Sequence, residues 1–145
     1  MTAISKGAGG LDGVVAAETA LSHVDGAQGE LIIAGEHVAT LAARYSFEAV
    51  TARLWSTAAA TPLDPADVTA QLEQARHAAF DLVPALLPLV GDMPVSGAFR
   101  AGVAALRPLA GLSAEAALVG GLPVLAAALA RQAQGLEPVA PRAGL

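Results

Sequence analysis

The sequence predicts a mainly α, multi-helical protein with a small β-hairpin near its N-terminus. Hydrophobic residues make up 54% of the chain and charged residues 14%. Much of the apolar share is alanine, which favours helix because it loses no side-chain entropy on ordering. Helix-capping residues precede several segments with apolar periodicity. A turn sequence at residues 25–29 separates two short runs typical of strands.

The hairpin is expected within residues 14–34. Segments 14–17 and 21–24 are expected to be extended, and β-branched isoleucines follow the turn. Between the runs, residues 25–29 are expected to form a turn, because Asp tolerates tight turns and Gly supplies a positive φ. We therefore expect two antiparallel strands that meet at this turn.

Residues 36–134 are predicted to be helical, in several pieces. The first piece ends near Arg44. Ser46 is a good N-cap for the second piece because its hydroxyl can accept a backbone N–H. Asp64 caps a third piece, with proline at the first helical position, where no N–H is needed. This third helix is expected to reach about Phe80.

Two prolines, at 84 and 88, are expected to limit the regularity of the next apolar stretch. Ser96 and Ser113 then cap two further helices. Gly135 is expected to cap the end of the last helix, and residues 135–145 are expected to form an extended tail. The last helix carries an apolar stripe, expected to be core or to meet a partner: Leu118, Leu122, Leu125 and Leu129.

Charge and composition argue against a nucleic-acid-binding role. The chain has 8 Lys and Arg against 13 Asp and Glu, a net charge of −5, and 3% aromatic residues. Phosphate contacts need clustered basic side chains, and base stacking needs aromatic ones. The chain has no cysteine, which excludes disulfides and thiolate metal sites and suits a cytoplasmic protein.

No secretory signal or membrane segment is expected. Residues 1–13 contain one lysine and no apolar run. The most apolar stretch, residues 116–130, is about 15 residues long, short of the ~20 that span a bilayer. Two glycines and a proline interrupt it, so a buried helix is the better interpretation.

The residues able to carry chemistry do not assemble into a recognisable motif. The histidines are His23, His37 and His77. Glu73 lies one helical turn before His77, but one carboxylate and one imidazole are too few ligands for a metal ion. Ser22 and His23 are adjacent, so they would point to opposite faces of a strand. We predict no catalytic, cofactor-binding or metal-binding residue in this chain.

Three segments carry motifs in a fixed order. Residues 10–35 read GLDGVVAAETALSHVDGAQGELIIAG, residues 46–50 read SFEAV, and residues 122–141 read LPVLAAALARQAQGLEPVAP. Together they resemble the N-terminal part of the citrate and methylcitrate synthase family, with its hairpin, its S-F-E-E-V helix and its G-x-x-P-x-x-P stretch. The resemblance implies a citrate-synthase-like fold over residues 1–145 as a single domain.

The resemblance also implies condensation of an acyl-CoA with a 2-oxo acid such as oxaloacetate. In the family an Asp removes the α-proton, a His stabilises the enol, and a second His with several Arg hold the oxo acid. Proton abstraction beside a thioester needs such positioned groups. In the family they all lie C-terminal to the G-x-x-P-x-x-P stretch, beyond Leu145. The chain alone is therefore expected to be an inactive part of an acyltransferase.

Three interpretations of such a chain are open. It is the non-catalytic N-terminal subunit of a split synthase, or a catalytically dead paralogue acting as a structural or regulatory partner, or a fragment of a full-length synthase. Departures at Ala34, where the family has Arg, and at Met93 favour the dead paralogue. The expected partner is a citrate-synthase-like catalytic chain or a second copy. The acyl-CoA and the oxo acid are expected to bind only in the complete assembly.

Overall fold

The computed structural model describes residues 18–108 and 110–142. Within these ranges it confirms a mainly helical fold with a small antiparallel sheet near the N-terminus. The elements are β1 (Ser22–Asp25), β2 (Glu30–Ile33), β3 (Glu36–His37), α1 (Val38–Arg44), α2 (Phe47–Ala59), α3 (Pro65–Val90), α4 (Val95–Ala105) and α5 (Ala114–Gln132).

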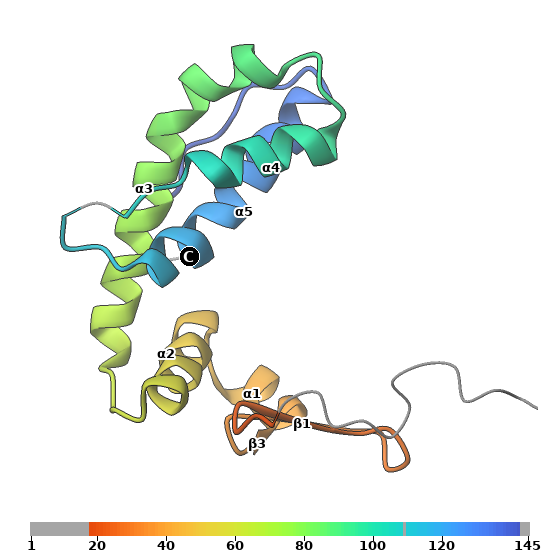
Figure 1. The fold of residues 1–145 in the computed structure, drawn as a ribbon, viewed down its shortest axis with the longest axis vertical. Coiled ribbons are helices and arrows are strands. Elements are labelled where there is room, and N and C mark those ends of the chain that lie inside the picture. The colour runs from red at the N-terminus through yellow and green to blue at the C-terminus, as the bar shows by residue number, and fades with distance from the viewer. Residues whose placement is uncertain (1–17, 109, 143–145) are drawn as a thin grey trace, which may run out of the picture.

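The elements form an open arc (Figure 1). Helices α3 and α5 pack side by side as its central part, and α4 covers one end of both. Helix α2 packs on the N-terminal part of α3, and α1 with the sheet forms the opposite arm. We call α3, α4 and α5 the body, and the sheet with α1 the arm.

The predicted hairpin is present. Strand β1 pairs antiparallel with β2, and Asp25 lies opposite Glu30. The Asp25 carboxylate Oδ1 accepts hydrogen bonds from the backbone N–H groups of Ala27 and Gln28, at 2.9 and 3.0 Å. Asp25 therefore builds the turn, as its sequence position predicts. The segment 14–17, expected to be extended, lies outside the described residues.

A third strand replaces the predicted start of the helical region. Glu36 and His37 pair with β2, so the first helix begins at Val38. The turn between β2 and β3 consists of Ala34 and Gly35, with φ of 48° and 79°. Two consecutive positive φ values are those of a type I′ turn, which matches the twist of a hairpin. This turn geometry turns the chain back along β2 before any helix begins.

Three predicted N-caps are confirmed. The side chains of Ser46, Asp64 and Ser113 accept hydrogen bonds from the backbone N–H two or three residues on, at 3.2, 2.8 and 3.1 Å. The fourth prediction was wrong, because α4 begins after Pro94 and not after Ser96. The Pro94 carbonyl already accepts the first helical hydrogen bonds, so Ser96 lies inside the helix.

Helix α3 is longer than predicted, because it continues through both internal prolines to Val90. Pro84 and Pro88 are exposed, one turn apart on the same face. Each removes one helical N–H donor. On the opposite face Val83 and Leu86 are 1% and 8% exposed, and their burial offsets the lost hydrogen bonds.

Helix α5 packs against α3 through a glycine pair. A Cβ on Gly120 would lie 2.6 Å from the Ala75 Cβ and 2.8 Å from the Leu72 carbonyl oxygen. A Cβ on Gly121 would lie 2.8 Å from a Leu106 methyl group. These glycines, which seemed to interrupt an apolar run, allow the close approach of two helix backbones.

The apolar core has two clusters. The first joins α2, α3 and the start of α5, and consists of Ala52, Val68, Leu72, Ala75, Leu112, Ala116 and Ala117. The second joins the far end of α3 to α4 and α5, and consists of Leu86, Val90, Ala98, Leu125 and Leu129. Each cluster uses a different half of α3 and α5, so these two helices carry most of the packing.

The predicted leucine stripe on α5 is divided between core and surface. Leu125 and Leu129 are 0% and 4% exposed in the second cluster, whereas Leu118 is 42% exposed and Leu122 is half-buried. The stripe is therefore not one interaction face. Gly135 has the positive φ of a helix-ending residue, and residues 136–142 contain no helix or strand.

By length and composition alone, α5 is long and apolar enough to cross a membrane. It has 19 residues, and its most apolar window has a mean hydropathy of 1.4. Core helices of soluble proteins have the same properties, so this finding is weak evidence for a membrane span. In this fold α5 packs against both α3 and α4.

Candidate functional site

The three histidines lie in two separate places. His23 on β1 and His37 on β3 are both aligned with Ile32 of β2, so the sheet brings them onto one face on either side of that residue. His77 lies on α3, and all three are exposed. In the described part of the chain, no group of three or more His, Asp or Glu could hold a metal ion.

No pattern in the sequence relates His23 to His37. The strand register alone aligns them. Ser22 and His23 are successive residues of β1 and point to opposite faces. Asp25 is engaged in its turn. These side chains therefore do not converge on one point where an acid, a base and a substrate could meet.

A partly buried ion pair links α2 to α3. The Arg76 Nη2 donates to Glu48 Oε1 at 2.7 Å, with the two side chains 17% and 12% exposed. The Arg76 hydrogen bond holds the pKa of the Glu48 carboxyl below its ordinary value of 4.5, against the opposing effect of burial. This ion pair positions α2 against α3, and each of its two charges neutralises the other.

A second polar link joins α2 to the arm. The Arg53 Nε donates a hydrogen bond of 3.1 Å to the Ala34 carbonyl oxygen, and its Nη2 lies 3.8 Å from Glu36 Oε2. The carbonyl of the strained turn is thus held by an arginine from another element. The Arg53 guanidinium therefore ties α2 to the arm.

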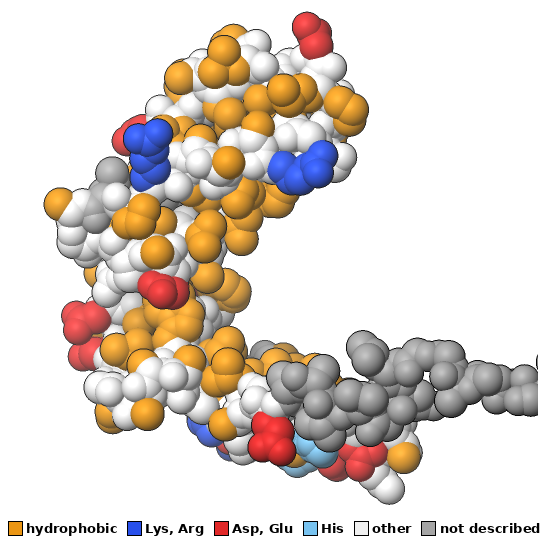
Figure 2. All heavy atoms as spheres, viewed as in Figure 1, with side chains coloured by type: hydrophobic (Ala, Val, Ile, Leu, Met, Phe, Trp, Pro, Cys, Tyr) orange, Lys and Arg blue, Asp and Glu red, His pale blue; other side chains and the backbone are white. Residues whose placement is uncertain are grey.

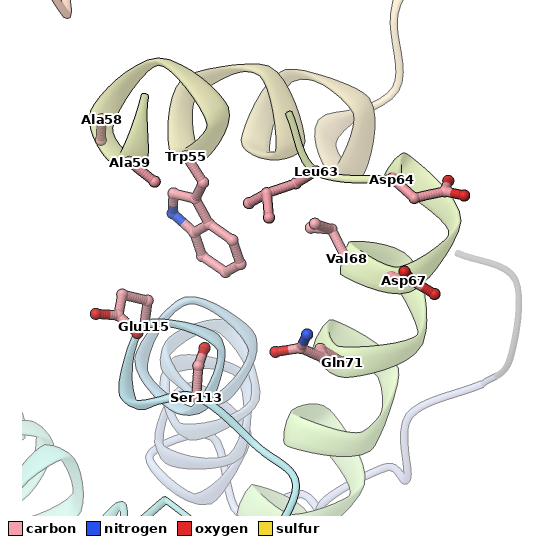
Figure 3. Close-up of a pocket in the computed structure, with 10 residues that line it drawn as sticks. All are labelled: Trp55, Ala58, Ala59, Leu63, Asp64, Asp67, Val68, Gln71, Ser113 and Glu115. Carbon is pink, nitrogen blue, oxygen red and sulfur yellow. The ribbon is translucent and has the colours of Figure 1, made fainter. Parts of the chain in front are cut away.

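A pocket lies where α2, the start of α3 and the start of α5 meet (Figure 3). Its volume is about 530 Å³. The Trp55 indole faces the gap between α2 and α5, and Leu63 and Val68 line the side toward α3. We call it the Trp55 pocket. Its lining is mostly apolar, with a polar margin.

The polar margin of the Trp55 pocket is acidic. Asp64 and Asp67 lie at the start of α3, and Glu115 lies at the start of α5, at opposite edges of the pocket (Figure 3). Among the residues that the structure describes, no Lys, Arg or His lines it. The first-turn position of each carboxylate also stabilises its own helix.

Sequence reasoning missed this pocket. It assigned Trp55 to the apolar side of α2 and Asp64 to a cap, and both assignments are correct locally. Only the packing of α2 beside α5 places the indole between two acidic helix starts. The one available signal was a single tryptophan just before a helix boundary.

Large apolar side chains are exposed on many elements. Figure 2 shows hydrophobic side chains along the inner edge of the arc and over the end that α4 forms. A chain that leaves this much apolar surface open is suited to further association. The exposed set is Val24, Val38, Tyr45, Phe47, Leu63, Leu89, Met93, Val95, Leu118, Leu136 and Val139.

The fold is a helical scaffold in which His23 and His37 share one face of the sheet and His77 lies on α3. The family model for citrate synthase, C-terminal domain, matches residues 10–145. The chain therefore belongs to the citrate synthase family. No curated protein matches it. The motifs quoted above resemble the N-terminal part of a synthase, and that placement within a complete enzyme stays a prediction.

Proposed function

We propose that this chain is the non-catalytic subunit of a split citrate-synthase-like enzyme. A second chain supplies the acid and base that condense an acyl-CoA with a 2-oxo acid such as oxaloacetate. The observation that carries the proposal is the dispersal of His23, His37 and His77 in a chain that matches the family model over residues 10–145. Condensation needs an acid and a base within hydrogen-bond reach of one carbon atom and its carbonyl.

The exposed apolar surface supports the role of a subunit. Each large apolar side chain that a partner covers fully contributes roughly 1.5–3 kcal/mol. Covering several of these exposed side chains is therefore enough to favour a lasting complex, after the cost of association is subtracted. We expect the assembly in the cytoplasm, consistent with a chain that has no cysteine.

The reaction is measured by the free thiol of the CoA that it releases. This chain has no cysteine, so it adds no thiol background to the assay. The purified chain is mixed with acetyl-CoA or propionyl-CoA and oxaloacetate, alone and with any citrate-synthase-like chain that the adjacent reading frame encodes. We expect no release of CoA from the chain alone and release from the pair. Release by the chain alone, above a heat-denatured control, contradicts the proposal.

The contact between the chains is tested on Leu118 and not on Leu125. Leu125 is 0% exposed, so a charge there disrupts the core whatever the interface. Leu118 is 42% exposed on the same helix and belongs to neither apolar cluster, so we expect Leu118→Glu to keep the core intact. We expect this variant to weaken the complex in size-exclusion chromatography, with Ala126→Glu, an exposed position on α5, as the matched control.

A dead paralogue with a regulatory role is the second candidate. It is favoured by Ala34, which stands where the family has Arg and adopts a φ of 48°. Such a protein binds an intact synthase without adding a catalytic part. If the neighbouring chain is fully active by itself and the mixture only changes its rate, the second candidate replaces the first.

A further inference from the structure

The Trp55 pocket has the size and lining of a site for a bulky apolar side chain. About 530 Å³ of space lies beside the indole, and Leu63 and Val68 form an apolar wall. Leu63 is 38% exposed although it lies between two helices. Apolar surface in a concave site is covered most effectively by an apolar group of matching size.

The charges at the margin of this pocket are of one sign. Asp64, Asp67 and Glu115 give a formal charge of −3. The two helix N-termini beside them contribute about +0.5 each, so about −2 remains. Neither Asp67 nor Glu115 forms an ion pair with a residue that the structure describes. The field at the mouth of the pocket therefore favours a cationic group.

The carboxylates lie at opposite edges of the pocket, with the indole between them (Figure 3). A single ion cannot contact both edges. A peptide segment can, if an apolar side chain enters the centre and basic side chains lie on both sides. We propose that the Trp55 pocket docks a segment of a partner protein that carries a bulky apolar residue flanked by Lys or Arg.

Charge complementarity selects this occupant over a second copy of the chain. The chain has a net charge of −5 and no run of basic residues. The basic residues of a second copy lie at least seven positions apart along the chain, and its approach to an acidic margin is opposed by like charge. This inference stands whether or not the partner is the catalytic chain of a synthase.

Trp55 is the only tryptophan of the chain, so its fluorescence reports on the pocket alone. The full chain is titrated with the peptide Lys-Lys-Leu-Phe-Lys-Lys. Two control peptides replace all four lysines by glutamate, or Leu-Phe by Gly-Ser. We expect a saturable change in Trp55 emission with the first peptide only, and weaker binding at high salt, because exposed charges are screened.

The double variant Asp67→Asn with Glu115→Gln tests the acidic margin. Each exposed charge pair changes affinity by roughly two- to fivefold, so we expect the double variant to bind the lysine peptide about five- to tenfold more weakly. The matched control is Asp81→Asn with Asp92→Asn, which removes the same charge from exposed positions away from the pocket. Circular dichroism checks that both variants stay helical.

Three results would overturn the inference. One is a Trp55 emission that does not respond to the lysine peptide at millimolar concentration. Another is an equal response to the glutamate peptide, or an equal loss of affinity in the two double variants. The third is an emission that changes with protein concentration alone, which would assign the pocket to a second copy.

Discussion

The body and the arm of this molecule are held by different interactions. In the body, Leu72 and Leu125 are 0% exposed, and Gly120 brings α5 onto α3 without space for a methyl group. In the arm, Val24 is 70% exposed, and Arg53 of α2 holds the Ala34 carbonyl oxygen through a 3.1 Å hydrogen bond. Packing therefore dominates the stability of the body, whereas turn geometry and a polar contact position the arm.

This difference predicts that side-chain truncations of equal size lower the free energy of unfolding by unequal amounts at tightly packed and at exposed positions. The largest effect is expected for Leu125→Ala in the body. Removing a fully buried leucine side chain leaves a cavity, and we expect the free energy of unfolding to fall by about 4 kcal/mol. Urea denaturation followed by circular dichroism measures it.

Leu89→Ala is the matched control, because Leu89 is 77% exposed on α3. The expected change there is within about 0.5 kcal/mol. Equal losses in the two variants would show that the second apolar cluster does not dominate the body.

Gly120→Ala tests the close packing of the two long helices. The new methyl group meets the Ala75 Cβ at 2.6 Å and a backbone oxygen at 2.8 Å, so one helix must move. We expect a loss of about 2–3 kcal/mol, although alanine is the better helix former. In the control Gly97→Ala the nearest atom is 3.9 Å away, and that variant should be about 0.5–1 kcal/mol more stable.

Glu48→Gln tests the ion pair that fixes α2 to the body. Hydrogen bonds to charged groups contribute roughly 1.5–3 kcal/mol, so we expect a loss of about 2 kcal/mol at neutral pH. The folded-state pKa of Glu48 is lowered from its ordinary value of 4.5. The stabilisation is therefore complete above that value and is lost as the pH falls through the folded-state pKa.

The pH dependence of the free energy of unfolding provides a control for this prediction. In Glu48→Gln the acid side of the stability profile should be flatter than in the unmodified chain. Asp92→Asn removes an exposed carboxylate and should leave the profile unchanged. A profile that is the same in all three proteins would contradict a stabilising role of the pair.

Ala34→Gly is expected to have the smallest effect, confined to the arm. A non-glycine residue at positive φ costs roughly 1–2 kcal/mol, and glycine removes part of that cost while loosening the unfolded chain. We expect a gain of about 0.5–1 kcal/mol. Hydrogen exchange should show stronger protection of β2 amides with little change in α3, whereas a global gain would show that arm and body unfold together.

Much of this fold follows from local signals. Asp25 marks the hairpin turn, and Ser46, Asp64 and Ser113 mark the starts of three helices. Each is read correctly because the side chain bonds to backbone groups within three residues of itself. The start of α4 was misplaced because Pro94 begins it without a side-chain bond.

The Trp55 pocket could not be predicted from its residues. Trp55 and Glu115 are far apart in the sequence, and no periodicity or motif relates them. Their meeting depends on α2 packing beside the start of α5, which the first apolar cluster fixes. The same holds for His23 and His37, which become neighbours of Ile32 only through the strand register.

The sequence alone determined the fold class, the family resemblance and most element boundaries, because propensity, caps and turns act over a few residues. Tertiary structure decided that α3 continues through Pro84 and Pro88, because burial of Val83 and Leu86 outweighs the missing hydrogen bonds. It also decided which α5 leucines are core. Periodicity gives a helix an apolar face, but only the neighbouring helices determine how much of that face is covered.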